Sequence, residues 1–434
     1  MDQPRVTVED LSTVRKRLQV EVPAGRVQAE LDRAFQRLGQ QAHLRGFRPG
    51  KAPRAVLERT FGAEVRREVL GHLVEESLQQ AIDAHGLAVV GNPDVDAETI
   101  TPGEALRYSA LVDVRPAIDV GDLHGLEVVR PPTVVSDEEV ERALGALRES
   151  VAQLRPVEDR AIVEPGDVVT VDITSRLEGG EPERRSGVLL EAGAGTFPRA
   201  LERQLVGRHR GERLSLRVPY PADYPNAGLA GKTAEFEVDI RDLRSKELPP
   251  LDDDFARDHG RCESVAELRA RIRADLEREA VARAEEAVRE AVLEQAIARQ
   301  RFEVPPSLVE RRTETLLAAL DVRLPEGADR QQALAEVRAR LHPQAEAQVR
   351  GELFLDALAV RDDLKVTEEE VTAEIDAIAA RQHRVIEQVR GFYKRAEARA
   401  ALRAKLVRER ALAGLVARAR VMPSSASESV AHEK

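Results

Sequence analysis

The change in amino-acid composition at Pro249-Pro250 limits what this chain can fold into more than any other feature. After it, the sequence is rich in Ala, Glu, Arg and Leu and contains very few glycines. Ser264 and Glu267 have the spacing of a capping box, and apolar residues recur at helical spacing from there toward residue 300. A helix of that length spans roughly 55 Å at 1.5 Å per residue. This half of the chain is therefore predicted to consist of long helices.

Prolines divide the rest of this helical half into further segments. Pro305, Pro306 and Pro325 interrupt the pattern, and Thr367 with Glu370 forms a second capping box. Further helices are predicted at about 307–321, 331–360, 367–383 and 385–420.

The first 115 residues have a mixed texture. Apolar and polar residues alternate in two segments, as they do in half-buried strands, and an apolar repeat of 3.6 residues occupies two others. The predicted strands are 14–22 and 105–115. A helix is predicted at 24–39, and one or two helices are predicted at 54–85. We therefore expect an α+β unit at the N-terminus.

Residues 163–245 carry a third texture, with short alternating segments separated by turns. The segment before them, 116–135, is rich in Pro and Gly and is predicted to be a connector rather than part of a core. A short helix is expected at 136–155, because Ser136 and Glu139 form a capping box. A chain of 434 residues suggests about three domains. The expected fold class is multidomain α+β, with an N-terminal α+β domain, an antiparallel β domain and an all-α C-terminal body of long helices.

Composition excludes several kinds of site. The chain has 66 Lys and Arg against 77 Asp and Glu, a net charge of −11, so we expect neither DNA nor a membrane as a partner. Aromatic residues are 3% of the chain, too few for a stacking platform for single-stranded nucleic acid. Cys262 is the single cysteine and the histidines form no ligand cluster, so we expect no metal and no cofactor. The lack of an apolar leader and of an 18-residue apolar run predicts a soluble, cytoplasmic protein.

Residues 228–233, GLAGKT, end like a phosphate-binding P-loop. That motif requires Gly where this chain has Asn226, and it requires a helix after Thr233. The residues that follow, AEFEVDI, alternate like a strand. Nucleotide binding is therefore not expected here.

The loop between the two N-terminal helices is strongly basic. Residues 33–67 contain nine basic residues and two acidic ones, although the whole chain is acidic. The loop itself, GFRPGKAP, combines Pro and Gly with cations on both sides of Phe47. Such a tip suits docking to phosphate and to an acidic protein surface, whereas charge alone is also typical of a solvated helix face.

At this loop the sequence resembles trigger factor, the bacterial ribosome-associated chaperone family, whose signature is G-F-R-x-G-x-x-P. The matching residues are Gly46, Phe47, Arg48, Gly50 and Pro53. The family usually has Lys after the arginine, and this chain has Pro49 there, while Lys51 is in place. Segments 116–128 and 248–260 also look like the two inter-domain segments of the family, in the same order. The resemblance covers essentially the whole chain.

The resemblance implies a division into domains. These are a ribosome-binding domain at 1–115, a linker and part of the helical body at 116–162, an FKBP-like peptidyl-prolyl isomerase domain at 163–245, a helical chaperone domain at 246–421 and a disordered tail at 422–434. The loop residues Gly46, Phe47, Arg48, Gly50, Lys51 and Pro53 would contact protein and rRNA of the large ribosomal subunit near the nascent-chain exit. The implied partners are the ribosome and unfolded nascent polypeptides, with a weak homodimer as a further possibility that the residue patterns leave open.

An FKBP-like isomerase needs a dry pocket that favours the twisted amide, and no acid or base. The residues at the pocket positions of the family are Ile173, Val188, Phe197, Leu201, Tyr224, Leu229 and Phe236. Ile173, Val188 and Leu201 stand where the family has aromatic residues. We therefore expect the fold to persist and the isomerase activity to be weak or lost.

Without an ATP motif, a chaperone can act only by weak, reversible shielding of apolar segments. The candidate residues for such contacts, which helix packing would explain equally, are Val309, Leu316, Leu317, Leu353, Phe354, Leu355, Leu358, Ile375, Ile378 and Phe392. The predicted function is an ATP-independent chaperone that docks on the ribosome and shields nascent chains during folding and export. The alternatives are a free-standing prolyl isomerase and a periplasmic-type holdase, and the absence of a signal peptide opposes the second.

Overall fold

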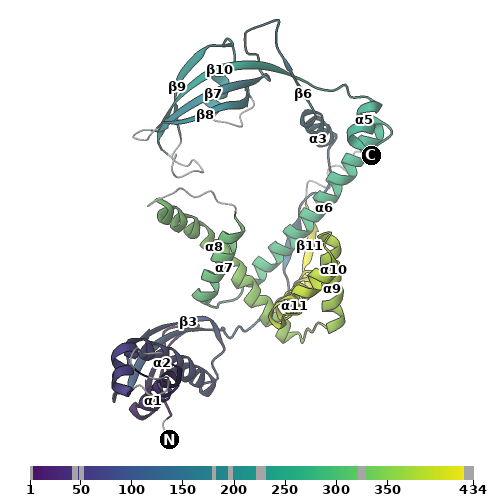
Figure 1. Ribbon diagram of the computed structural model, residues 1–434. Helices are drawn as coiled ribbons and strands as arrows, with labels where there is room; N and C mark the ends of the chain where they lie inside the picture. The colour runs from purple at the N-terminus through teal and green to yellow at the C-terminus, as the bar shows by residue number, and fades with distance from the viewer. Residues whose placement is uncertain are drawn as a thin grey trace. The chain divides into compact units, whose positions relative to one another are not determined.

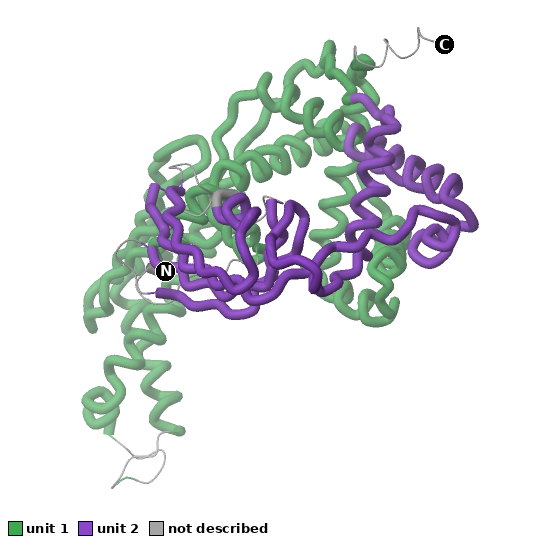
Figure 2. Tube along the Cα trace, turned by 90° about the horizontal axis from the view of Figure 1, so that it is seen from above, with its two compact units in different colours: residues 1–131, 285–425 green, residues 132–284, 426–434 purple. Residues whose placement is uncertain are grey.

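The computed structural model describes residues 3–41, 47, 53–177, 182–193, 199–220, 231–320 and 329–424 (Figure 1). The chain forms two compact units (Figure 2). One unit contains the described residues up to 131 and from 285 onward, and the other contains the described residues between 132 and 284. None of the helices in the described part of the chain is long and apolar enough to cross a membrane. The multidomain α+β fold class is confirmed.

The N-terminal domain, described here as residues up to 115, is a four-stranded antiparallel sheet with two helices on one face. Its strands run in the order β1-β2-β4-β3. The elements are β1 (Arg5–Asp10), β2 (Arg15–Val22), α1 (Ala24–Gln41), α2 (Arg54–Ala84), β3 (Val89–Ala97) and β4 (Leu106–Val114). The predicted strands and helices of this domain are confirmed, and α2 is one continuous helix. The edge strands β1 and β3 were not predicted, because their exposed positions carry little apolar signal.

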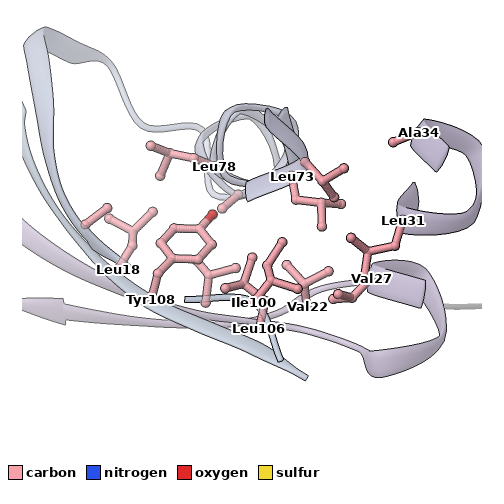
Figure 3. Packing of buried hydrophobic residues seen from close by; sticks show 14 of the residues in the cluster. Leu18, Val22, Val27, Leu31, Ala34, Leu73, Leu78, Ile100, Leu106 and Tyr108 are labelled. Carbon is pink, nitrogen blue, oxygen red and sulfur yellow. The ribbon is translucent and has the colours of Figure 1, made fainter. Parts of the chain in front are cut away.

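The core of this domain lies between the sheet and the helices. Alternate residues of β2 and β4, among them Leu18, Val22, Leu106 and Tyr108, face α1 and α2 (Figure 3). Val20 pairs with Tyr108 across the two strands. The Tyr108 hydroxyl lies 2.7 Å from Ser77 Oγ, which also donates to the Leu73 carbonyl at 2.5 Å. The two buried hydroxyls therefore satisfy one another and a helix carbonyl.

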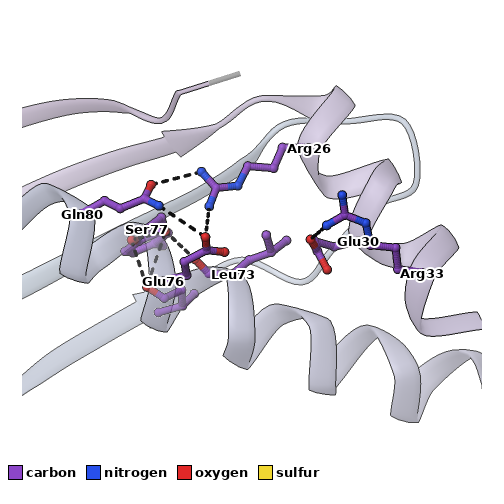
Figure 4. A network of polar contacts seen from close by, with 9 residues as sticks. Arg26, Glu30, Arg33, Leu73, Glu76, Ser77 and Gln80 are labelled. Atoms are coloured by element: carbon purple, nitrogen blue, oxygen red, sulfur yellow. Dashed lines mark hydrogen bonds and ion pairs between the residues drawn. The ribbon is translucent and has the colours of Figure 1, made fainter. Parts of the chain in front are cut away.

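A polar network at the surface of the same domain joins α1 to α2 (Figure 4). Arg26 of α1 donates to Gln80 at 3.2 Å and pairs with Glu76 at 2.8 Å, both on α2. Gln80 also donates to Glu76 at 3.3 Å. The helix pair is thus held by an apolar face inside and by charges outside.

The described residues of the β-rich domain form a five-stranded sheet whose strands pair antiparallel. The sheet order is β6-β10-β7-β8, and β9 pairs with β10. Its elements are β6 (Gln153–Pro156), β7 (Val168–Leu177), β8 (Glu183–Glu191), α4 (Arg199–Leu205), β9 (Arg213–Pro219) and β10 (Thr233–Glu247). Strand β10 is long enough to pair with β9 along its first half and with β6 along its last four residues. The prediction of an antiparallel β domain in this part of the chain is confirmed.

The long helices predicted after residue 249 are confirmed with one correction, and the helix predicted at 136–155 was too long, because it ends at Ser150 and residues 153–156 form β6. The elements are α3 (Asp137–Ser150), α5 (Asp253–Gly260), α6 (Val265–Ala298), α7 (Pro306–Ala319), α8 (Asp329–Arg361), α9 (Glu368–Arg381), α10 (Ile386–Phe392) and α11 (Ala396–Arg418). The prediction of one helix over 385–420 was wrong, since the chain breaks between α10 and α11. Val389 and Leu402 both pack in the cluster around α9, yet thirteen residues would place them roughly 140° apart on a straight helix. The break lets both side chains reach the same core.

The segment 116–135 was predicted to be a connector outside any core, and this was wrong. Val120, Leu123, Leu126 and Val128 are buried in one cluster with residues of α6, α8 and α11. The segment also contributes β5 (Glu127–Arg130), which pairs in parallel with β11 (Arg420–Pro423). Its prolines and glycines explain why its backbone is irregular. They do not determine whether its side chains are buried.

Candidate functional site

The first candidate site is the loop that joins α1 to α2. Phe47 lies in this loop with 39% of its surface exposed. Pro53 is exposed and precedes α2 with φ −62° and ψ 145°, an extended geometry that Pro favours before a helix. The predicted loop residues Gly46, Arg48, Gly50 and Lys51 lie outside the described residues.

Arg54 fixes the base of this loop. Its guanidinium pairs with Asp32 of α1 at 2.6 Å and with Glu58 of α2 at 2.7 Å. It also lies over the Phe35 ring, 5.1 Å from the ring centre. The hydrogen bond from Arg54 is the main cause that lowers the pKa of Asp32. Arg54 therefore serves the helix junction, and its charge is already neutralised there.

Other cations near the loop remain on the surface. Arg37 of α1 and Arg59 and Arg67 of α2 are exposed, and none of them has an ion-pair partner among the described residues. Arg33 is different, because it pairs with Glu30 at 2.6 Å. The helix pair was predicted to be strongly basic. Only those of its cations that are not already paired can bind a phosphate-rich or acidic partner.

The second candidate site is the apolar interior of the β-rich domain. The structure brings together Ile173 of β7, Val188 of β8, Leu201 of α4 and Phe236 of β10 around one hydrophobic cluster. Leu201 is fully buried, at 0% exposure, and Val188 is half-buried. The predicted pocket residues Phe197, Tyr224 and Leu229 lie outside the described residues.

Strand register explains why these side chains meet. Ile173 pairs with Val238 of β10, and Phe236 lies two residues further along the same strand. The side chains therefore share one face of adjacent strands as diagonal neighbours. Leu201 covers this face from α4.

The acidic neighbour of Ile173 lies on the other face. The Asp172 carboxylate accepts from the Gly187 N–H at 3.0 Å and from Arg241 Nε at 2.9 Å. The backbone hydrogen bond from Gly187, followed by the bond from Arg241, lowers the pKa of Asp172. The charge stays outside the cluster, so the inner face is apolar, as a pocket that twists an amide requires.

One aromatic residue of this cluster was not predicted. Tyr220 follows β9, is buried, and donates its backbone N–H to the Lys232 carbonyl at 2.9 Å. That bond joins the end of β9 to the start of β10. The signal available in the sequence was a tyrosine four residues before Tyr224 in a chain with few aromatic residues.

The geometry after GLAGKT is that of a strand. Gly231 has φ +71°, and β10 begins at Thr233. A P-loop would require a helix N-terminus at this point. The described backbone therefore agrees with the prediction that this motif does not bind nucleotide.

Comparison with known proteins covers all three parts of the chain. Residues 5–147 match the family described as bacterial trigger factor protein, and residues 264–417 match the C-terminus of the same protein family. A trigger factor from Anaeromyxobacter sp. (strain Fw109-5) is 38% identical over 429 residues, which is 97% of this chain and 100% of the relative. The chain belongs to the trigger factor family.

The middle part carries the enzyme domain of the family. Residues 160–241 match FKBP-type peptidyl-prolyl cis-trans isomerase. The trigger factor of Geobacter metallireducens is 34% identical, over 89% of this chain and 91% of its own. A solved structure titled "Promiscuous Substrate Recognition in Folding and Assembly Activities of the Trigger Factor Chaperone" covers 94% of this chain and 99% of its own, with 21% identity and a TM-score of 0.48. The family models and the trigger factor relatives confirm the predicted family. The roles of individual loop and pocket residues stay predictions.

Proposed function

We propose that this chain is an ATP-independent chaperone that docks on the large ribosomal subunit and shields nascent polypeptides during folding and export. In this proposal residues 1–115 bind the ribosome, 163–245 form the isomerase domain and the helical remainder holds clients. The observation that carries it is the trigger factor signature at 46–53 in a chain 38% identical to a trigger factor over nearly its full length.

Docking would combine two kinds of contact at the loop. The exposed Phe47 ring supplies apolar area, and Arg48 and Lys51 supply charge for phosphate or carboxylate. The arrangement of Arg54 supports this, because its pairs with Asp32 and Glu58 hold the two helices together at the base of the loop. Binding of this kind should weaken steeply with salt.

Shielding would use apolar side chains that the helical cores leave exposed. Six of the ten predicted contact residues are buried in helix packing and are not available to a client: Val309, Leu353, Phe354, Leu355, Leu358 and Ile375. Phe392 is 56% exposed and stays a candidate, and Val360, at 83%, and Val385, at 57%, join it. No larger apolar patch is formed by the described residues Val360, Val385 and Phe392 alone, since each comes from a different position of the helical region, so contact with a client through them would be weak and reversible.

A double substitution tests ribosome docking against a matched control. The variant Phe47→Ala/Arg48→Ala should lose co-sedimentation with ribosomes at low salt. The control Phe392→Ala/Arg395→Ala removes the same two residue types from an exposed site and should leave co-sedimentation unchanged while weakening suppression of aggregation. Full co-sedimentation of the first variant would contradict docking through this loop.

We further propose that the isomerase domain turns over proline peptides only weakly. Ile173, Val188 and Leu201 give the inner face aliphatic side chains where the family has aromatic ones, so less ring surface faces a twisted amide. The alternative is that Phe197, Tyr224 and Phe236 suffice.

Adjacent positions of β8 provide a test of this second proposal. Val188→Tyr adds an aromatic ring on the cluster side and should raise the turnover of a proline test peptide. Leu189→Tyr adds the same ring at an exposed position and should not. Turnover by the unmodified chain at the level of a fully aromatic FKBP-type enzyme would contradict the proposal.

A further inference from the structure

The N-terminal domain and the start of α7 meet at a small contact within one compact unit. Strand β3 and α7 carry this contact (Figure 1). We infer that Gly91, Asp113 and Ser307 form a lock that holds the N-terminal domain on the helical region, so that the two move as one body. The inference goes beyond the proposed function and does not depend on ribosome docking.

Asp113 is the centre of the lock. Its side chain is at the end of β4 and the residue is only 5% exposed. Its carboxylate accepts from Arg15 Nε at 2.8 Å and from the Ser307 N–H at 2.7 Å. Separating the domains would remove the Ser307 donor from the Asp113 carboxylate. Because a buried carboxylate is unfavourable when it lacks partners, this loss favours the closed contact.

The partner of Asp113 is a helix N-terminus. Pro306 is the first residue of α7 and has no N–H, so Ser307 offers the first free donor of the helix. An anionic group is favoured at this end of a helix, because the helix dipole is positive there. Asp113 therefore caps a helix that belongs to the other region of the chain.

Gly91 supplies the fit. The pairing of β3 with β4 shifts between Val90 and Asp94, and Gly91 lies in this irregular stretch with φ +73°. A Cβ at Gly91 would lie 2.4 Å from Ser307 Oγ and 2.6 Å from Ser307 Cβ. Ser307 Oγ donates to the Val90 carbonyl at 3.2 Å. The bulge of β3 is thus shaped to receive Ser307, and only glycine leaves the space.

Charged contacts surround this buried centre. Thr13 donates from Oγ1 to Glu303 at 2.8 Å and from its N–H at 3.2 Å. On another side, Arg115 pairs with Asp356 at 3.3 Å. These contacts are exposed and individually weak, so the lock depends on the buried Asp113 and the half-buried Gly91 and Ser307.

Hydrogen exchange of the full-length chain tests the lock directly. The Ser307 amide is bonded to Asp113, so its exchange rate reports how often the lock opens. Gly91→Ala should accelerate exchange of the peptide containing Ser307 by about tenfold or more. Amides of β2 and β4 should stay protected, because the N-terminal sheet itself is unchanged.

A matched control separates the clash from backbone strain. Gly103 also has a positive φ, +84°, but nothing lies within 4 Å of the point that a Cβ would occupy there. Gly103→Ala should therefore leave exchange at Ser307 unchanged. Adding Ser307→Gly to Gly91→Ala removes the clashing atoms and should slow exchange back toward the rate of the Ser307→Gly single variant.

A second substitution keeps the test decisive if Gly91→Ala disturbs β3. Asp113→Asn keeps the shape of the side chain and removes its charge, and should accelerate exchange at Ser307 severalfold. Unchanged exchange at Ser307 in both Gly91→Ala and Asp113→Asn would overturn the lock. Equal acceleration by Gly103→Ala would overturn it too, since that would assign the effect to strain in the domain.

Discussion

The N-terminal domain and the β-rich domain are built alike and place their candidate sites differently. Each has an antiparallel sheet with helix on one face. In the N-terminal domain the site is a loop outside the core, with Phe47 exposed and Arg54 anchoring its base. In the β-rich domain the predicted pocket residues Ile173, Leu201 and Phe236 are themselves core residues. We therefore expect stability and the proposed function to be separable in the first domain and coupled in the second.

The largest effect should come from the domain in which site and core coincide. Leu201→Ala removes a fully buried side chain from α4 and should destabilise the β-rich domain by about 2–5 kcal/mol. Domain-resolved hydrogen exchange should show the loss in β7, β9 and β10 and no change in β2 or β4. Loss of protection in both domains would show that they unfold together and would break the comparison.

An intermediate effect is expected inside the N-terminal core. Tyr108→Phe keeps the ring and removes the hydroxyl that lies 2.7 Å from Ser77 Oγ. Ser77 Oγ retains its bond to the Leu73 carbonyl, so the expected loss is only about 1 kcal/mol. Denaturant unfolding followed in this domain measures it. Ribosome binding should persist, because the substitution leaves the loop residues unchanged.

Acid should weaken the lock. Burial would raise the pKa of Asp113, but the hydrogen bonds from Arg15 and Ser307 outweigh burial and hold the pKa below its usual range. The bond from Thr13 is the main cause that lowers the pKa of Glu303. The unfolded or unlocked chain therefore binds more protons near pH 4, so these carboxylates stabilise the locked state above about pH 4 and lose that contribution as the pH falls further.

Exchange at Ser307 after pH correction measures this effect. It should rise below about pH 4 in the unmodified chain and rise less in Asp113→Asn, which lacks the titrating group. An equal rise in both would remove Asp113 from the explanation.

The smallest effect on stability should come from the exposed loop. Phe47→Ala should change the free energy of unfolding by less than about 0.5 kcal/mol, because a surface residue away from any cap or core is replaced. Thermal unfolding measures this alongside ribosome co-sedimentation. A large loss of stability would mean that Phe47 packs into the domain, and the loop would then resemble the coupled site of the β-rich domain.

Local chemistry determined much of this protein from the sequence alone. Thr367 with Glu370 and Ser136 with Glu139 form the capping boxes that the sequence predicts, because a cap needs only atoms a few residues apart. Periodic apolar residues located the helices and the inner strands for the same reason. The loop signature at 46–53 and the two inter-domain segments, 116–128 and 248–260, identified the family.

Contacts between distant residues were decided only by the tertiary structure. The burial of 116–128, the break between α10 and α11, and the edge strands depend on what packs against each segment, which local patterns do not contain. Asp113 meets Ser307 across 194 residues of chain. Neither residue belongs to a motif, and only their fit with Gly91 makes them a pair.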